Sequence, residues 1–255
     1  MRSKQRLIGV APLLLLAGAL TATAAAAQEK APGRIAEVWV LWPEEDKIAE
    51  FEAAAKKFVA WRKQTGEPYS WTAFQPIVGD DLGHYVWRSG EHHWGDLDAN
   101  AAWAMKAKAD EQYQKDLAPL VRHIEHYITE DDLEHSQWTE AEYRYFQVES
   151  FKIKPGGHGA MLEALDKIHK AAVAAKFPRS YAISNTRGGD GGMTVVFPYK
   201  SYADMAEPDP PFMKVLAQNL GSEEAAKAAM QQLNASFEET HTTIYAVRPD
   251  LSTQK

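Results

Sequence analysis

The chain has 255 residues, a formal net charge of −7 at pH 7 and no cysteine. The lack of cysteine excludes disulfides, thiolate catalysis and cysteine-ligated metal or iron–sulfur centres. The acidic balance argues against nucleic acid and anionic membrane surfaces as partners, because both require clustered lysine and arginine, and a hydrophobic content of 45% argues against a disordered chain.

The first 27 residues have the pattern of a secretory signal peptide. A basic start precedes the apolar run 7–20, and small residues follow up to Ala27. The apolar run is shorter than the roughly 20 residues that a membrane-spanning helix needs. We therefore expect cleavage after Ala27, a short linker at 28–33, and a periplasmic or secreted protein that leaves the membrane.

Residues 34–135 are predicted to form one βαββαβ unit. Apolar and polar residues alternate along 34–43, which is typical of a strand, whereas Phe51, Ala55 and Phe58 share one stripe of a helix. In chain order, the expected elements are a strand at 34–43, a helix within 44–66, a hairpin turning at 79–81, a helix at about 98–115 and a strand at 119–130.

The same order recurs over 136–255. Gly83 corresponds to Gly191, 108 residues later, and the His-x3-Tyr pattern at 123–127 recurs at 241–245, 118 residues later. These offsets indicate a tandem repeat of one module. In chain order, the second half is expected to contain a strand at 143–153, a helix at 157–176, a hairpin turning at 190–191, helices at 211–220 and 222–235 and a strand at 237–249.

A βαββαβ unit has a four-stranded antiparallel sheet with its helices on one face, so the other face needs a partner. We therefore predict an α+β fold in which two tandem ferredoxin-like modules pack sheet to sheet as an intrachain α+β barrel. This order and duplication across residues 34–249 resemble the dimeric α+β barrel superfamily. That superfamily includes antibiotic-biosynthesis-type monooxygenases, NIPSNAP-like proteins and the haem-binding chlorite dismutases.

Strand alternation predicts which side chains face the cleft between the two sheets. In the first strand, Val38 and Val40 are expected to face the helices. Glu37, Trp39 and Leu41 then face the cleft, and the residues 108 positions later do the same. The candidate ligand-binding residues are Trp39, His84, Arg88, His123, Glu125, Tyr127, Tyr145, Gln147, His241 and Tyr245.

Some of the histidines are close together in the sequence, which raises the question of a metal site. His92 and His93 lie at a strand end without further ligands at metal-binding spacing, so we expect a solvated turn and no metal there. His123 and Glu125 share one face of a strand. They are suited to acid–base chemistry or to a structural hydrogen bond, and the sequence leaves both readings open.

Three functions remain open from the sequence. The first is binding of a small aromatic or amphipathic molecule in the cleft between the modules, where aromatic side chains offer stacking surfaces. The second, implied by the resemblance, is a monooxygenase-like or haem-dependent enzyme that uses His84, His123 or His241. The third is an interaction module without a ligand. The sequence identifies no cofactor, and it allows either a monomer or a homodimer.

Overall fold

The structure, a computed structural model, describes residues 33–188 and 192–253 and contains one closed barrel of eight strands within them. Two predicted features lie outside the described residues. The first is the signal peptide at 1–27, together with all but the last residue of the linker 28–33, and the second is the hairpin turn at 190–191.

The first half has the predicted order of elements with one difference. The helix expected at about 98–115 is divided in two at Lys108, whose backbone is left-handed (φ 56°). The elements are β1 (Ile35–Pro43), α1 (Ile48–Gln64), β2 (Thr72–Val78), β3 (Tyr85–His92), α2 (Trp94–Ala107), α3 (Ala109–Asp116), a 3-10 turn (Ala118–Leu120) and β4 (Val121–Asp131).

The second half repeats this order. The helix expected at 157–176 is present, and Met161, Leu165, Ile168 and Ala172 on its inner face are all buried. The elements are β5 (Tyr145–Ile153), α4 (His158–Ala174), β6 (Ala182–Arg187), β7 (Gly192–Tyr199), a 3-10 turn (Ala203–Met205), α5 (Phe212–Leu220), α6 (Glu223–Ala235), β8 (Phe237–Val247) and a last 3-10 turn (Pro249–Leu251).

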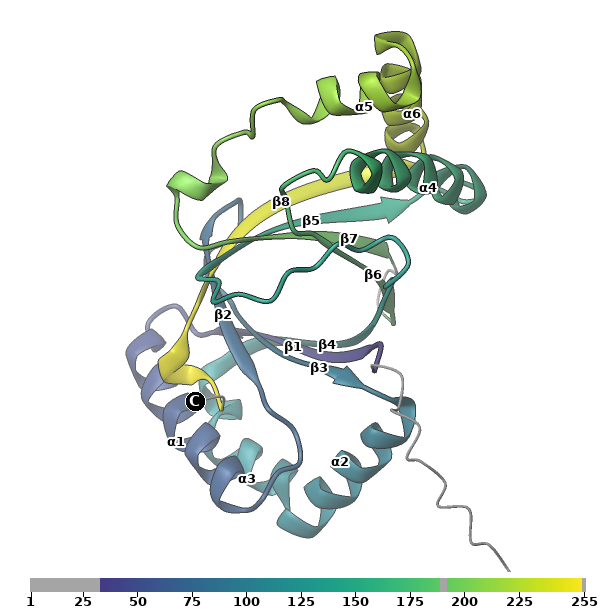
Figure 1. Ribbon diagram of the computed structural model, residues 1–255. Helices are drawn as coiled ribbons and strands as arrows, with labels where there is room; N and C mark the ends of the chain where they lie inside the picture. Colours follow the sequence, from purple (N-terminus) through teal and green to yellow (C-terminus); the bar gives the residue numbers. More distant parts are fainter. Residues whose placement is uncertain (1–32, 189–191, 254–255) are drawn as a thin grey trace, which may run out of the picture. The chain divides into compact units, whose positions relative to one another are not determined.

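The strands follow the order β1-β3-β2-β8-β5-β7-β6-β4 around the barrel. Each half supplies a four-stranded antiparallel sheet, and the β2–β8 and β4–β6 pairs join the two sheets. Figure 1 shows α1, α2 and α3 outside the first sheet and α4, α5 and α6 outside the second. The predicted fold class is therefore confirmed.

The two junctions between the sheets are short. Strand β4 pairs with β6 only over Ile128–Asp131, and β8 pairs with β2 only over Ile244–Val247. The preceding parts of both strands, 122–126 and 238–242, pair on one side only, and their side chains are exposed. Charged and polar residues dominate these segments, as expected for edges that must not recruit another strand.

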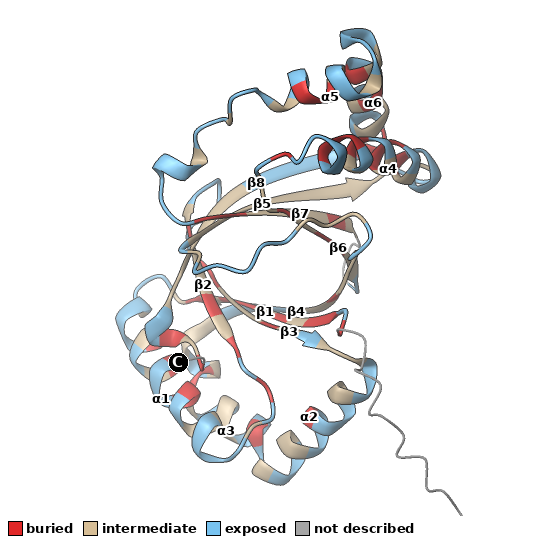
Figure 2. Cartoon of the chain, in the orientation of Figure 1, coloured by how far each residue is buried: buried red, intermediate tan, exposed pale blue. Residues whose placement is uncertain are grey.

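Each half has its own hydrophobic core between sheet and helices, visible as buried residues in Figure 2. The first core contains Phe51 and Tyr85, and the second contains Met161, Ile183 and Met193. Both cores lie on the outer face of the barrel sheet, so the helices have the same role in both halves.

The C-terminal segment after β8 returns to the first half. Leu251 is fully buried in the first core, and the Arg248 guanidinium donates to Glu52 Oε1 on α1 at 2.7 Å. The backbone N–H of Thr253 donates to Trp71 O at 2.8 Å, and Thr253 Oγ1 accepts from Trp71 N–H at 2.5 Å. The end of the second half therefore completes the first core.

The predicted faces of the first strand of each half are wrong. Leu41 belongs to the helix-side core, so Trp39 and Glu37, at even spacing from it, face the helices, and Val38 and Val40 face the barrel interior. Both faces of β1 are shielded from solvent, so the alternation of residues could not show which face lies against the helices. The Trp39 ring packs against the helix-side core.

The same correction applies to β5. Phe151 packs in the second core, so Tyr145 and Gln147 also lie on the helix side of the sheet. Phe146 points into the barrel instead, where it meets Phe74 of β2 at 5.3 Å between ring centroids. Of the ten candidate residues, Trp39, Tyr145 and Gln147 therefore lie outside the predicted cleft.

Candidate functional site

A cavity of about 410 Å³ lies between the first sheet and the three helices that cover it. Strands β1, β3 and β4 form its floor, and α1, α2 and α3 form its walls. The lining residues are Glu37, Trp39, Leu41, Ala55, Phe58, Val59, Arg62, Trp71, Trp87, Leu97, Asn100, Ala101, Ala104, Ala109, Asp110, Tyr113, Leu117, Ile124, His126 and Thr253. We call this space the first-half cavity.

The cavity exists because large residues on the sheet face small residues on the helices. Trp39 and Trp87 are neighbours across the β1–β3 ladder and present a broad aromatic surface. Ala101 and Ala104 of α2, with Ala109 at the start of α3, place only methyl groups opposite them. Short side chains leave the space unfilled, and aromatic walls favour flat apolar occupants.

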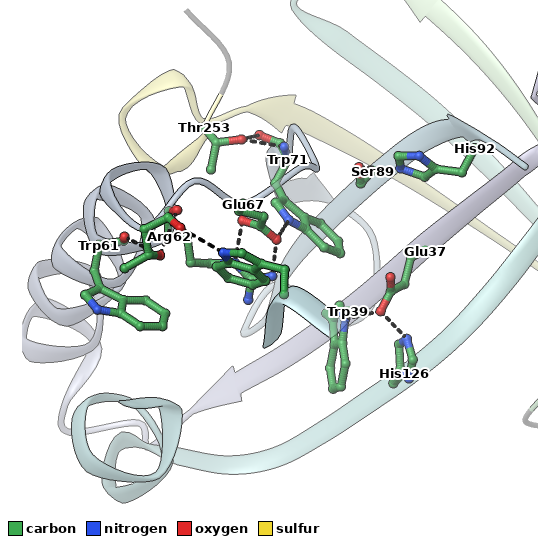
Figure 3. A network of polar contacts seen from close by, with 12 residues as sticks. Glu37, Trp39, Trp61, Arg62, Glu67, Trp71, Ser89, His92, His126 and Thr253 are labelled. Carbon is green, nitrogen blue, oxygen red and sulfur yellow. Dashed lines mark hydrogen bonds and ion pairs between the residues drawn. The ribbon is translucent and has the colours of Figure 1, made fainter. Parts of the chain in front are cut away.

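A polar cluster lies at one edge of the aromatic floor (Figure 3). The His126 ring stacks on Trp39, with ring centroids 3.8 Å apart and planes within 9°. Glu37 Oε1 lies 3.0 Å from His126 Nε2 and accepts from the Trp39 indole N–H at 3.1 Å. Burial alone would raise the pKa of Glu37, but His126 and Trp39 outweigh it and hold that pKa below its usual value.

A buried ion pair supports the opposite side. Arg62 of α1 pairs with Glu67, whose side chain is only 1% exposed, and the Arg62 Nε–Glu67 Oε2 distance is 2.7 Å. Glu67 also accepts from the Trp71 indole N–H at 2.7 Å. The guanidinium lies over the rings of Phe58, Trp71 and Trp103 at 5.2–5.5 Å. Figure 3 shows Trp71, Arg62 and Glu67 together.

One polar atom of the lining has no partner. Asn100, on α2, is 8% exposed, and its Oδ1 makes no hydrogen bond to the protein. Three other buried side-chain atoms among the described residues share this property, but none of them belongs to the lining of the first-half cavity. A buried acceptor without a partner costs about 1–3 kcal/mol.

The barrel interior holds most of the candidate residues named from the sequence. A second cavity of about 700 Å³ at one end of the barrel is lined by Glu125, Tyr127 and His241, together with Lys152 and Glu239. Burial raises the pKa of Tyr127 to about 12. Lys152 and His241 both lie within 4 Å of Glu239.

A separate cluster in the interior joins the two halves. His84 Nε2 lies 3.2 Å from the hydroxyl of Tyr245, and its Nδ1 lies 3.4 Å from Asp81 Oδ2. The Trp42 indole N–H donates to Asp81 at 2.6 Å, and its ring lies next to both His84 and His123. These contacts link β1 and the residue preceding β3 in the first half to β8 of the second, although His84 Nδ1 makes no hydrogen bond within the protein.

Arg88 and Asp131 form a further pair inside the barrel. The Arg88 guanidinium donates to the two carboxylate oxygens of Asp131 at 3.2 and 3.1 Å. Burial raises the pKa of Asp131 above its usual value, although Arg88 opposes the shift. The pair links β3 to β4 across β1.

Stability at mildly acidic pH is expected to depend on His84. Burial lowers the pKa of His84, and Asp81 only partly opposes this. The unfolded chain, in which histidine titrates near about pH 6.5, takes up the proton first, so the folded state loses stability as the pH falls below that value. We expect His84→Gln to lose less unfolding free energy than the wild type between about pH 7 and about pH 5. Urea unfolding at both pH values measures this, and equal losses in the two proteins would contradict the assignment.

The structure brings the interior candidates together but separates them from the first-half cavity. His84 meets Tyr245, and Glu125, Tyr127 and His241 line one space. Their roles in ligand binding stay predictions. The residues that sequence reasoning missed are Glu37 as a partner of His126, together with Arg62 and Asn100. The sequence could have placed His126 on the helix side, because it lies two residues after Ile124 in the same strand and both line the cavity.

Other kinds of site find no support in the part of the chain that the structure describes. Among residues 33–188 and 192–253, no three His, Cys, Asp or Glu side chains are close enough to hold a metal ion. Within the same residues, no helix is long and apolar enough to cross a membrane. His92 is not the solvated residue we expected, because its ring stacks on Tyr69 at 3.7 Å and its Nε2 lies 2.7 Å from Ser89 Oγ.

Sequence comparisons give no relative, because no family model and no curated protein matches the chain. Solved structures do match. A candidate monooxygenase from Lactobacillus acidophilus shares 10% identity over 86% of this chain and 95% of its own, with a TM-score of 0.52. An anthrone oxidase-like protein shares 16% over 84% and 91%, with a TM-score of 0.50. A chlorite dismutase variant from Candidatus Nitrospira defluvii shares 8% over 85% and 92%, with a TM-score of 0.53.

These structures define the class of the protein at the level of fold. The chain has the fold of the dimeric α+β barrel superfamily, with both halves of the barrel supplied by one polypeptide. At identities of 8–16% the likeness concerns the fold and does not extend to activity.

The haem of the chlorite dismutases does not fit the residues of the first-half cavity. A haem carries two carboxylates that need basic partners. Arg62, the arginine of the lining, is already paired with Glu67, and the lining carboxylates Glu37 and Asp110 would repel the carboxylates of a haem. The face of the His126 ring is also covered by Trp39.

Proposed function

We propose that the protein binds a small, flat aromatic molecule in the first-half cavity. The observation that carries this proposal is a space of about 410 Å³ with tryptophans on its floor and alanines on its walls. A cavity of this size and lining matches the usual form of a small-molecule site. The proposal keeps the ligand class expected from the sequence and moves the site from the barrel interior to the helix side.

The contacts of the lining support a preformed site. Trp39 is held between His126 and Glu37, and Trp71 is held by Glu67. Trp87 donates its indole N–H to Leu251 O at 3.0 Å. Side chains fixed in this way lose little entropy when a ligand stacks on them.

A matched pair of variants tests the proposal. Ala104 lines the cavity, whereas Ala102 is an exposed residue of the same helix. With a panel of two- and three-ring aromatic compounds that includes anthrone, we expect at least one to raise the melting temperature of the wild type and of Ala102→Trp. At a hundred times its Kd a ligand adds about 2.7 kcal/mol, or about 5–10 °C for a domain of this size.

Ala104→Trp fills the cavity and should abolish that shift. A panel that shifts neither the wild type nor Ala102→Trp would count against the proposal. So would a shift that survives in Ala104→Trp, because the compound would then bind elsewhere.

Oxidation of the bound aromatic is a second candidate function, favoured by the Glu37–His126 pair beside the aromatic floor. A carboxylate–imidazole pair can accept a proton from an acidic CH₂ group. Anthrone and dioxygen give anthraquinone and water, with the substrate supplying the electrons. Dioxygen uptake with anthrone in Ala102→Trp, and none in Ala104→Trp, would support this candidate over simple binding.

Three further features remain proposals from the sequence. Export through the signal peptide 1–27 and a periplasmic or secreted location are the first. The second is the division into modules at 34–135 and 136–255. The third is a monomer or homodimer that binds a small molecule and neither nucleic acid nor membrane.

A further inference from the structure

We infer that Asn100 selects ligands that carry a neutral N–H or O–H donor. This inference rests on the proposed function, since it concerns the ligand of the first-half cavity. It adds a chemical requirement that neither the size nor the apolar lining of the cavity imposes.

Asn100 is a buried polar residue in the wall of the cavity. Its side chain lines the cavity and is 8% exposed, and its Oδ1 has no partner in the protein. The lining residues one turn to either side on α2 are Leu97 and Ala104, which offer it no donor. Polar atoms that are buried without a partner are rare and call for an explanation, and a ligand donor would satisfy this one.

Four donor side chains of the lining already have partners within the protein. The indole N–H groups of Trp39, Trp71 and Trp87 donate to Glu37, Glu67 and Leu251 O, respectively. The Arg62 guanidinium is paired with Glu67. These four donors are already engaged within the protein, and Asn100 Oδ1 is the buried side-chain atom of the lining that is left without a partner.

The apolar lining and Asn100 Oδ1 together define the chemical class of the ligand. An aromatic compound that stacks on the floor of the cavity and donates from its edge satisfies both the apolar walls and Asn100 Oδ1. A compound of the same shape without a donor leaves the oxygen buried and unpaired. A site built to pair with a donor rejects the analogue that lacks it.

Three bicyclic probes of nearly equal shape test this requirement. Indole has an N–H donor, indene has no polar atom, and benzofuran has only a ring oxygen. By titration calorimetry we expect the wild type to bind indole about tenfold more tightly than indene or benzofuran. In Asn100→Leu the three affinities should become equal within about twofold.

Stability without ligand gives an independent readout. Asn100→Leu replaces the unpaired oxygen with methyl groups, so its melting temperature should rise by about 2–4 °C. Asn100→Ala serves as a second variant that cannot clash, and it too should lose the preference for indole. Ala104→Val is the matched control, because it narrows the cavity and should weaken all three probes equally without changing their ratio.

The outcomes separate the inference from the proposed function. Equal binding of the three probes by the wild type would overturn the role of Asn100 while leaving the cavity as a binding site. Preference for benzofuran would overturn it as well, because the side chain would then be donating. Binding of no probe, combined with no response to the larger aromatic panel, would remove both the inference and the proposed function.

Discussion

Replacing Glu67 with alanine is expected to lower the free energy of unfolding by about 3–5 kcal/mol. Glu67 is 1% exposed and is the partner of the Arg62 guanidinium. Without it, the Arg62 guanidinium, whose side chain is only 20% exposed, loses its ion-pair partner, and the Trp71 indole N–H loses its acceptor. The aromatic rings around Arg62 soften this loss, since cation–π contacts contribute about 1–2 kcal/mol when desolvated.

Urea unfolding of the full chain measures this change. Glu111→Ala is the matched control, because its ion pair with Lys108 is mostly exposed and is expected to contribute at most about 0.5 kcal/mol. If Glu67→Ala unfolded at the same urea concentration as Glu111→Ala, the Arg62–Glu67 pair would not support the wall of the cavity.

Replacing Leu251 with alanine is expected to cost about 3 kcal/mol of unfolding free energy, within the usual range of about 2–5 kcal/mol for buried leucines. Leu251 is fully buried among Phe51, Tyr85 and other members of the first core. Because its backbone oxygen also accepts from Trp87, loosening this segment should weaken the binding of aromatic ligands in the first-half cavity.

Leu133→Ala is the control for this variant, since Leu133 is 41% exposed and should change stability by less than about 0.5 kcal/mol. Urea unfolding gives the stabilities, and calorimetric titration with indole gives the affinities. A Leu251→Ala protein as stable as Leu133→Ala would show that the C-terminal segment does not complete the first core.

The arrangement of elements was accessible from sequence because it depends on local patterns. Helical stripes such as the one through Met161 and Leu165 and turn residues around Gly79 mark element boundaries. The repeated His-x3-Tyr pattern then revealed the duplication. A duplicated split-βαβ unit has few ways to cover its bare sheet, which is why the barrel could be predicted as well.

The faces of β1 and β5 depend on something that alternation does not record. When one face of a strand is exposed to solvent, the alternation of polar and apolar residues shows which face is buried. In β1, Val38 and Trp39 lie on opposite faces, and both faces are shielded from solvent. Placing Glu37 next to His126 also requires the β1–β4 pairing. That pairing joins residues almost ninety positions apart, so no local pattern contains it.

The cavity itself was the least accessible feature. It depends on which residues of α2 and α3 face the sheet, and these two helices are separated by the left-handed Lys108, which the sequence did not indicate. Asn100 looks like any polar helix residue in the sequence. Its buried, unpaired oxygen appears only when the helix is packed in place.

The return of the C-terminal segment to the first half also bears on how the protein is made. A ribosome delivers the chain from its N-terminus, and domains usually begin to fold as they emerge. Here the first core lacks Leu251 until the segment that follows β8 has been synthesised. The first half therefore reaches its final packing only after the whole second half has been made.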